Sequence, residues 1–92
     1  MKNFLTRVEL HGAQSSDYTK LHDYMYQEKF FMFIRGDDGK AYGLPTAEYR
    51  SSGDLTTDGV RALACRAASK TGRAFSVIVV DYNSAAWVLT PL

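Results

Sequence analysis

Strand-like and helix-like patterns of apolar residues alternate along this chain, and their order constrains its fold more than any other feature. Apolar side chains at every second position, or a short apolar run, predict a strand, whereas a spacing of three or four predicts a helix. The strand-like segments are residues 3–11, 30–35, 46–51 and 75–82. The helix-like segments are residues 16–28 and the stretch between Thr56 and Gly72. A short further strand is expected at residues 85–89.

The resulting order is strand, helix, strand, strand, helix, strand, which is the order of ferredoxin-like domains. It predicts an α+β sandwich in which an antiparallel four-stranded sheet carries both helices on one face. Two right-handed crossovers would place the first and third strands at the centre of that sheet. A chain of 92 residues can build only one core, so residues 1–92 are expected to form a single domain. This fold hosts many unrelated activities, so function has to be argued from particular residues.

Residues with strong positional preferences mark the ends of these elements. Ser15 or Ser16 can cap the first helix, and Thr56 can cap the second, by accepting a hydrogen bond from a free backbone N–H. Asp38-Gly39 is a reversal signal between the second and third strands. These signals support the proposed boundaries of the elements.

Charge and cysteine content exclude several classes of protein. Eleven basic and ten acidic residues give a net charge of +1, far below that of proteins that hold nucleic acid by bulk electrostatic attraction. The longest apolar run, residues 30–34, is much shorter than the about 20 residues of a membrane span, so no membrane association is expected. No export signal is recognised, and the single cysteine, Cys65, cannot form an internal disulfide. A cytoplasmic location is therefore expected.

The sequence predicts neither a metal site nor a cofactor. A zinc site needs about four Cys, His or carboxylate ligands, and the chain has one cysteine and two histidines at no recognised ligand spacing. It also lacks a phosphate-binding loop, a dinucleotide-binding glycine motif and the serine motif of α/β-hydrolases. Cys65 lies on or beside the apolar stripe of the second helix, where packing explains it.

Two histidines and three arginines are the candidate residues for chemistry on RNA. Histidine can act as acid or base when a ribose 2′-hydroxyl attacks the neighbouring phosphate, and this cleavage needs no metal ion. The candidate acid–base residues are His11, at the end of the first strand, and His22, on the first helix. The candidate phosphate-binding residues are Arg7, Arg35 and Arg50. The alternative for each histidine is a hydrogen-bonded structural role.

The sheet face opposite the helices is expected to be open. RNA-recognition modules of this topology stack bases on aromatic side chains of such a face. Phe33, Tyr42 and Tyr49 are the aromatic candidates, although packing in the core or in a subunit interface is the favoured interpretation.

Several short segments are similar to one known family. They are Ser15-Ser16 before the first helix, Leu21 through Met25-Tyr26, Phe30, Asp38-Gly39, Leu44-Pro45 and residues 75–82. With these segments the chain resembles the GhoS family, small endoribonuclease antitoxins of type V toxin–antitoxin systems. It resembles more distantly the nuclease-like proteins of CRISPR adaptation.

The resemblance implies a ferredoxin-like, dimeric domain that acts on RNA, and in that family the substrate is the transcript of a small membrane toxin. Two positions depart from the pattern. His11 stands where the CRISPR-adaptation nucleases place a metal-binding aspartate, and His22 stands where the closest relatives carry a basic residue. The resemblance therefore does not favour a magnesium-dependent mechanism.

Two functions of different classes follow from the sequence. The first is a small RNA-acting protein, expected to be a sequence-selective endoribonuclease of the antitoxin type. The alternative is a non-enzymatic protein-binding or dimerisation module. In that alternative the C-terminal segment around Trp87 forms a homodimer, since an apolar stretch near a terminus suits an edge strand or an interface anchor.

Overall fold

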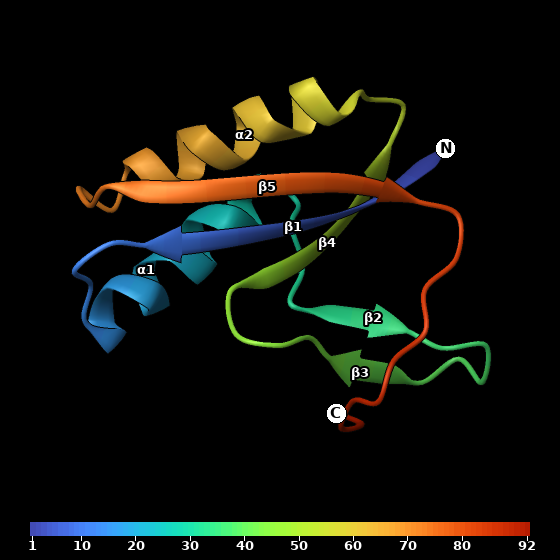
Figure 1. Cartoon of the computed structure of the whole chain (residues 1–92). Coiled ribbons are helices and arrows are strands. Elements are labelled where there is room, and N and C mark those ends of the chain that lie inside the picture. Colours follow the sequence, from blue (N-terminus) through green and yellow to red (C-terminus); the bar gives the residue numbers. More distant parts are fainter.

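The computed structural model describes all 92 residues, which form two helices and five strands (Figure 1). The strands are β1 (Lys2–Leu10), β2 (Phe33–Arg35), β3 (Ala41–Gly43), β4 (Glu48–Gly53) and β5 (Phe75–Tyr82). The helices are α1 (Ser15–Gln27) and α2 (Thr57–Ser69). The α+β class predicted from the sequence is confirmed. The short strand β3 is additional to the strands expected from the sequence.

Three strands form an antiparallel sheet in the order β4-β1-β5. The strand β1 is central, as predicted, but β4, the expected third strand, lies at an edge of this sheet. Leu5 of β1 lies opposite Arg50 on β4 and Val80 on β5. Alternate residues of β1, from Phe4 to Leu10, are buried, so one face of this strand lies in the core and the other face is open.

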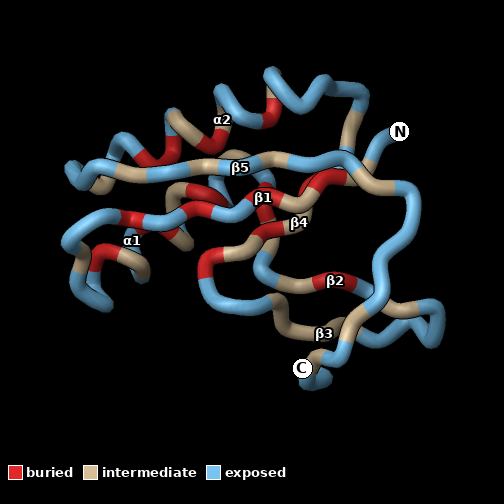
Figure 2. Tube along the Cα trace, in the orientation of Figure 1, coloured by how far each residue is buried: buried red, intermediate tan, exposed pale blue.

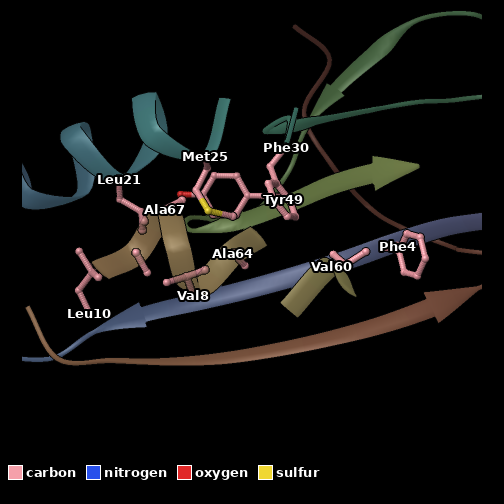
Figure 3. Packing of buried hydrophobic residues seen from close by; sticks show 11 residues of the cluster. Phe4, Val8, Leu10, Leu21, Met25, Phe30, Tyr49, Val60, Ala64 and Ala67 are labelled. Atoms are coloured by element: carbon pink, nitrogen blue, oxygen red, sulfur yellow. The ribbon is translucent and has the colours of Figure 1, made fainter. Parts of the chain in front are cut away.

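The core lies between the sheet and both helices (Figures 2 and 3). The strand β1 contributes Phe4, Val8 and Leu10, and β4 contributes the fully buried ring of Tyr49. The helix α1 buries two long side chains, and α2 buries one valine and three alanines: Leu21, Met25, Val60, Ala64, Ala67 and Ala68. Alanines leave room for the helix backbone to approach the sheet closely, which is why α2 packs along both β1 and β5.

The segment predicted as the second strand of a four-stranded sheet joins that sheet at one point only. Phe31 and Arg50 exchange two backbone hydrogen bonds of 2.9 and 2.7 Å, which form an isolated bridge to β4. The chain then turns away, and β2 pairs with β3 in a separate two-stranded hairpin. The sheet therefore has three strands and a bridge where four strands were expected.

Local turn chemistry stabilises the separate hairpin. Asp38 accepts hydrogen bonds from the Tyr42 hydroxyl at 2.7 Å and from the Lys40 N–H at 3.0 Å, and both bonds close the hairpin. A side chain on Gly36 would collide with Asp38, since a Cβ there would lie 2.9 Å from its Oδ1. Pro45 has no N–H to donate, so the chain beyond β3 cannot continue a regular ladder.

The C-terminal segment does not form the strand expected at residues 85–89. It leaves β5, crosses to the hairpin and lies beside β3, as Figure 1 shows. The Gly43 N–H donates to the Thr90 carbonyl at 3.1 Å, and the Leu92 N–H donates to the Ala41 carbonyl at 3.0 Å. The C-terminal residues thus join the hairpin by an isolated bridge between Tyr42 and Pro91, and β5 is left with one unpaired edge.

The helix caps agree with the sequence at one helix and differ at the other. Thr56 caps α2 as predicted, with its Oγ1 accepting the Gly59 N–H at 3.0 Å. The cap of α1 is Gln14 in place of the predicted Ser15 or Ser16, and the Asp17 carboxylate accepts the Gln14 N–H at 2.9 Å. Neither helix is long and apolar enough to cross a membrane.

Candidate nucleic-acid interface

The open face of the sheet is the first surface on which a ligand could lie. Strand alternation turns Leu5, Arg7 and Glu9 of β1 to this face, and it turns Arg50 of β4 and Ile78 of β5 to the same side. These side chains are exposed or half-buried, whereas the neighbouring residues are buried on β1 and β4 and half-buried on β5. The open face therefore combines charged and apolar groups.

A pocket of about 610 Å³ lies where this face meets the hairpin and the C-terminal segment. We call it the arginine pocket. The sheet contributes Asn3 and Arg50, and the C-terminal segment closes the opposite side, where Figure 1 shows it spanning from β5 to β3. The full lining is Asn3, Phe31, Phe33, Ile34, Arg35, Asp37, Arg50, Tyr82, Ser84, Ala85 and Trp87.

Two of the three predicted phosphate-binding arginines meet in this pocket. Arg35 comes from the end of β2, where its guanidinium lies 5.7 Å from the centre of the Phe33 ring and donates to the Gly39 carbonyl at 3.1 Å. Arg50 comes from β4 and forms no ion pair. Asp37 is the only acidic residue of the lining, so the pocket carries a net positive charge.

Four aromatic residues surround these arginines. Phe31 and Phe33 precede Arg35 on the hairpin, and their ring centres are 5.7 Å apart. Tyr82 and Trp87 complete the set from the other side of the pocket. Guanidinium groups can bind the phosphates of single-stranded nucleic acid, and flat aromatic rings can stack on its bases.

The third predicted arginine, Arg7, lies elsewhere on the open face. It lies between Glu48 on β4 and Ile78 on β5, and it lines a shallow hollow of about 240 Å³ together with Glu9 and Ser76. It does not line the arginine pocket, and its role as a phosphate ligand remains a prediction.

The two predicted acid–base histidines are not brought together. His11 is exposed at the end of β1, where its Nε2 lies 2.9 Å from the Ser76 Oγ and 3.7 Å from Glu9, on the open side of the sheet. His22 lies on the helix side, where its Nδ1 is 2.7 Å from the hydroxyl of Tyr49. One imidazole thus lies on each side of the sheet, and they share no cavity.

The environment of His22 favours its neutral form. Burial lowers the pKa of His22 because the charged imidazolium loses hydration, and the nearby Asp23 carboxylate opposes this effect only in part. Burial also raises the pKa of Tyr49, so its phenol stays protonated beside the imidazole.

Sequence reasoning found only one of the four aromatic residues of this site, Phe33. Trp87, which the sequence places in a dimer interface, packs against Tyr42 of its own chain, with ring centres 6.1 Å apart, and the dimer stays a prediction. Tyr42 bonds to Asp38 within the hairpin and does not lie on the open face of the sheet, and Tyr49 belongs to the core. The available signal was the sequence spacing of Phe31, Phe33 and Arg35, because a spacing of two places all three side chains on one face of an extended segment.

No group of three or more His, Cys, Asp or Glu side chains comes together in the structure. No protein-family model matches the chain, and comparison with curated proteins gives no match either. The assignment of function therefore depends on the geometry of the arginine pocket.

Proposed function

We propose that this protein binds single-stranded RNA in the arginine pocket. The observation that carries the proposal is the meeting of Arg35 and Arg50, from two different strands, among four aromatic side chains. Each guanidinium can form paired hydrogen bonds with a phosphate, and the rings can stack on unpaired bases. A net charge of +1 agrees with such local recognition, because the binding charge is concentrated in one pocket.

The RNA-acting function predicted from the sequence, including the antitoxin-type endoribonuclease that the GhoS resemblance implies, extends this proposal. Binding is the part that the geometry supports better, since His11 and His22 lie on opposite sides of the sheet. Cleavage is tested separately, by incubating the protein with labelled RNA in the presence and absence of EDTA and mapping new ends. Loss of EDTA-resistant cuts on replacement of His22 would support cleavage, and a protein that leaves RNA intact would restrict the function to binding.

Salt dependence of RNA affinity tests the binding proposal directly. For single strands, each phosphate contact contributes about −0.7 to the slope of log affinity against log salt. Arg35→Ala and Arg50→Ala should each lower the affinity and make the slope shallower by about 0.7. Arg61→Ala is the matched control, because Arg61 is an exposed arginine of α2 that pairs with Asp58 outside the pocket. Equal losses in all three variants would contradict the proposal.

The unpaired edge of β5 favours a second candidate function, self-association. Residues 75–80 contain no charged residue and no proline, and Ile78 and Val80 are 63% and 46% exposed. Exposed edges of this kind are normally protected by charge, proline or a covering element. A second copy fits here because the uncharged stretch 75–80 can pair with itself in antiparallel orientation without repulsion.

The C-terminal segment provides the control for this second candidate. Ile78→Lys should convert a dimer into a monomer in light scattering, because it places a charge at the centre of the paired edge. Deletion of residues 83–92 tests the dimer around Trp87 that the sequence suggested. A monomer on deletion, together with an unchanged mass for Ile78→Lys, would assign the contact to the C-terminal segment instead.

A further inference from the structure

A second, apolar pocket lies on the helix side of the hairpin. We call it the aromatic pocket. It has a volume of about 420 Å³, within the range of about 300–1,000 Å³ of small-molecule sites. Tyr26 and Met32 are 60% and 45% exposed, so they border the opening of the pocket. Its lining is His22, Tyr26, Phe30, Phe31, Met32, Phe33 and Leu92.

The two pockets are neighbours that share a wall. Phe31 and Phe33 line both the arginine pocket and the aromatic pocket. The Tyr26 ring meets the Phe31 ring edge to face, with centres 5.6 Å apart and planes at 86°. A chain whose phosphates lie on Arg35 and Arg50 is therefore separated from the aromatic pocket only by this pair of phenylalanines.

His22 supplies a hydrogen-bonding group to this mostly apolar lining. The buried Tyr49 hydroxyl has no other hydrogen-bond partner for its proton, so we assign it as the donor to Nδ1 of His22. An uncharged imidazole that accepts at Nδ1 must carry its proton at Nε2. Nε2 forms no hydrogen bond within the chain and is the polar atom that His22 offers to a ligand.

We infer that the aromatic pocket receives one unstacked nucleobase of the RNA bound in the arginine pocket. A nucleobase is a flat ring that stacks on aromatic side chains, and its carbonyl oxygens or ring nitrogens accept a hydrogen bond from the His22 Nε2–H. The inference rests on the proposed function, because the arginine pocket has to hold the adjoining phosphates. The aromatic pocket would be a second site, on the opposite side of the hairpin, that distinguishes a nucleotide with a base from an abasic sugar.

The test uses short single-stranded RNAs that carry 2-aminopurine at one position, moved along the strand in turn, and matched RNAs with an abasic sugar at the same position. Stacking in the pocket should quench the 2-aminopurine emission at one position. The abasic RNA should bind about 5- to 100-fold more weakly at that position, which corresponds to the usual stacking contribution of one base.

Variants separate the pocket from the rest of the protein. Tyr26→Ala should abolish the quenching and the preference over abasic RNA, while affinity for the abasic RNA is retained. Tyr24→Ala is the matched control, since Tyr24 lies on the same helix under the Lys70 ammonium and lines neither pocket. Arg35→Ala should instead weaken normal and abasic RNA alike.

Failure of the pocket and failure of RNA binding give different results. Arginine-dependent RNA binding without quenching, and with equal affinity for abasic RNA, would overturn the nucleobase inference and leave the proposed function in place. If no RNA binds, free adenine and uracil are titrated against the His22 and Tyr26 NMR signals. Binding lost in Tyr26→Ala would keep a base pocket but assign its ligand to a free base, and no binding would overturn the inference with the proposed function.

Discussion

The imidazole of His22 and the phenol of Tyr49 are joined by a hydrogen bond of 2.7 Å that ties α1 to β4. The rings are tilted at 58°, with centres 5.9 Å apart, so the contact is a hydrogen bond at the ring edges rather than a stack. Tyr49 is fully buried, and this bond is the only one that its hydroxyl makes. The pair therefore makes the packing of α1 sensitive to protonation of one histidine.

We predict that acidification destabilises the protein through His22. The pKa of His22 is lowered in the folded state, so the unfolded chain binds more protons between this value and about pH 6.5. Stability is therefore fully present above about pH 6.5 and is lost as the pH falls toward the folded pKa. Urea unfolding at several pH values measures this loss. The carboxylates of Asp17 and Glu28, whose pKa values are also lowered, act only at more acidic pH.

The histidine variants assign this effect. His22→Gln removes the titrating group and should flatten the pH dependence between about pH 7 and pH 5. His11→Gln removes the other histidine, which lies at the surface, and is the matched control. A pH dependence that disappears in His11→Gln and persists in His22→Gln would contradict this prediction.

We predict that Thr6→Val stabilises the protein. Thr6 is 1% exposed, and its hydroxyl has no hydrogen-bond partner. Replacing this buried hydroxyl by a methyl group should raise the free energy of unfolding by about 1 kcal/mol. Thr6→Ala removes the hydroxyl but also leaves a cavity, so it should be less stable than Thr6→Val. A Thr6→Val protein that unfolds more easily than the wild type would indicate that the hydroxyl is paired in solution.

We predict that Thr56→Ala weakens the start of α2. The Thr56 Oγ1 accepts the Gly59 N–H at 3.0 Å, and removal of such a cap costs about 1 kcal/mol. The melting temperature should fall by about 4–8 °C for a domain of this size. Thr57→Ala is the control, because Thr57 is the next residue and makes no side-chain hydrogen bond. The melting temperatures are measured by calorimetry, and an equal fall in both variants would contradict the assignment of Thr56 as the cap.

We predict that the emission of Trp87 reports how the C-terminal segment is docked. Trp87 is the only tryptophan, and it packs against Tyr42. Deletion of residues 90–92 removes the backbone bonds to β3, so the indole should become more exposed and its emission should shift to the red. Val88→Ala, at a fully exposed neighbouring position, should leave the emission unchanged. An unshifted spectrum after the deletion would mean that Trp87 is held without these bonds.

Much of the fold follows from local pattern. The buried alternation of β1 was readable because the side chains of a strand alternate between its faces, and Thr56 was readable because a cap needs only its own turn. The cap of α1 was missed because Gln14 acts together with Asp17, and serine was the stronger local signal. The boundaries of the helices and strands differ from the predicted ones by one to a few residues; α1, for example, spans Ser15–Gln27 where residues 16–28 were predicted.

The candidate site was only half predictable. Arg35 and Arg50 were identified by residue type, but their approach depends on the bridge between Phe31 and Arg50, which no local pattern encodes. The histidines show the opposite outcome. Their residue type suggests a shared acid–base role, but His11 and His22 lie on different sides of the sheet.

The sequence by itself determined the α+β class, the two helices and the order of the long strands, because periodicity and capping act over a few residues. The tertiary structure decided which strands pair. It separated the hairpin β2-β3 from the sheet, and it placed the C-terminal segment beside β3. Pairing between distant segments depends on competition among many possible edges, and that competition is settled by packing of the whole chain. The arginine pocket and the aromatic pocket both result from this arrangement of the hairpin and the C-terminal segment.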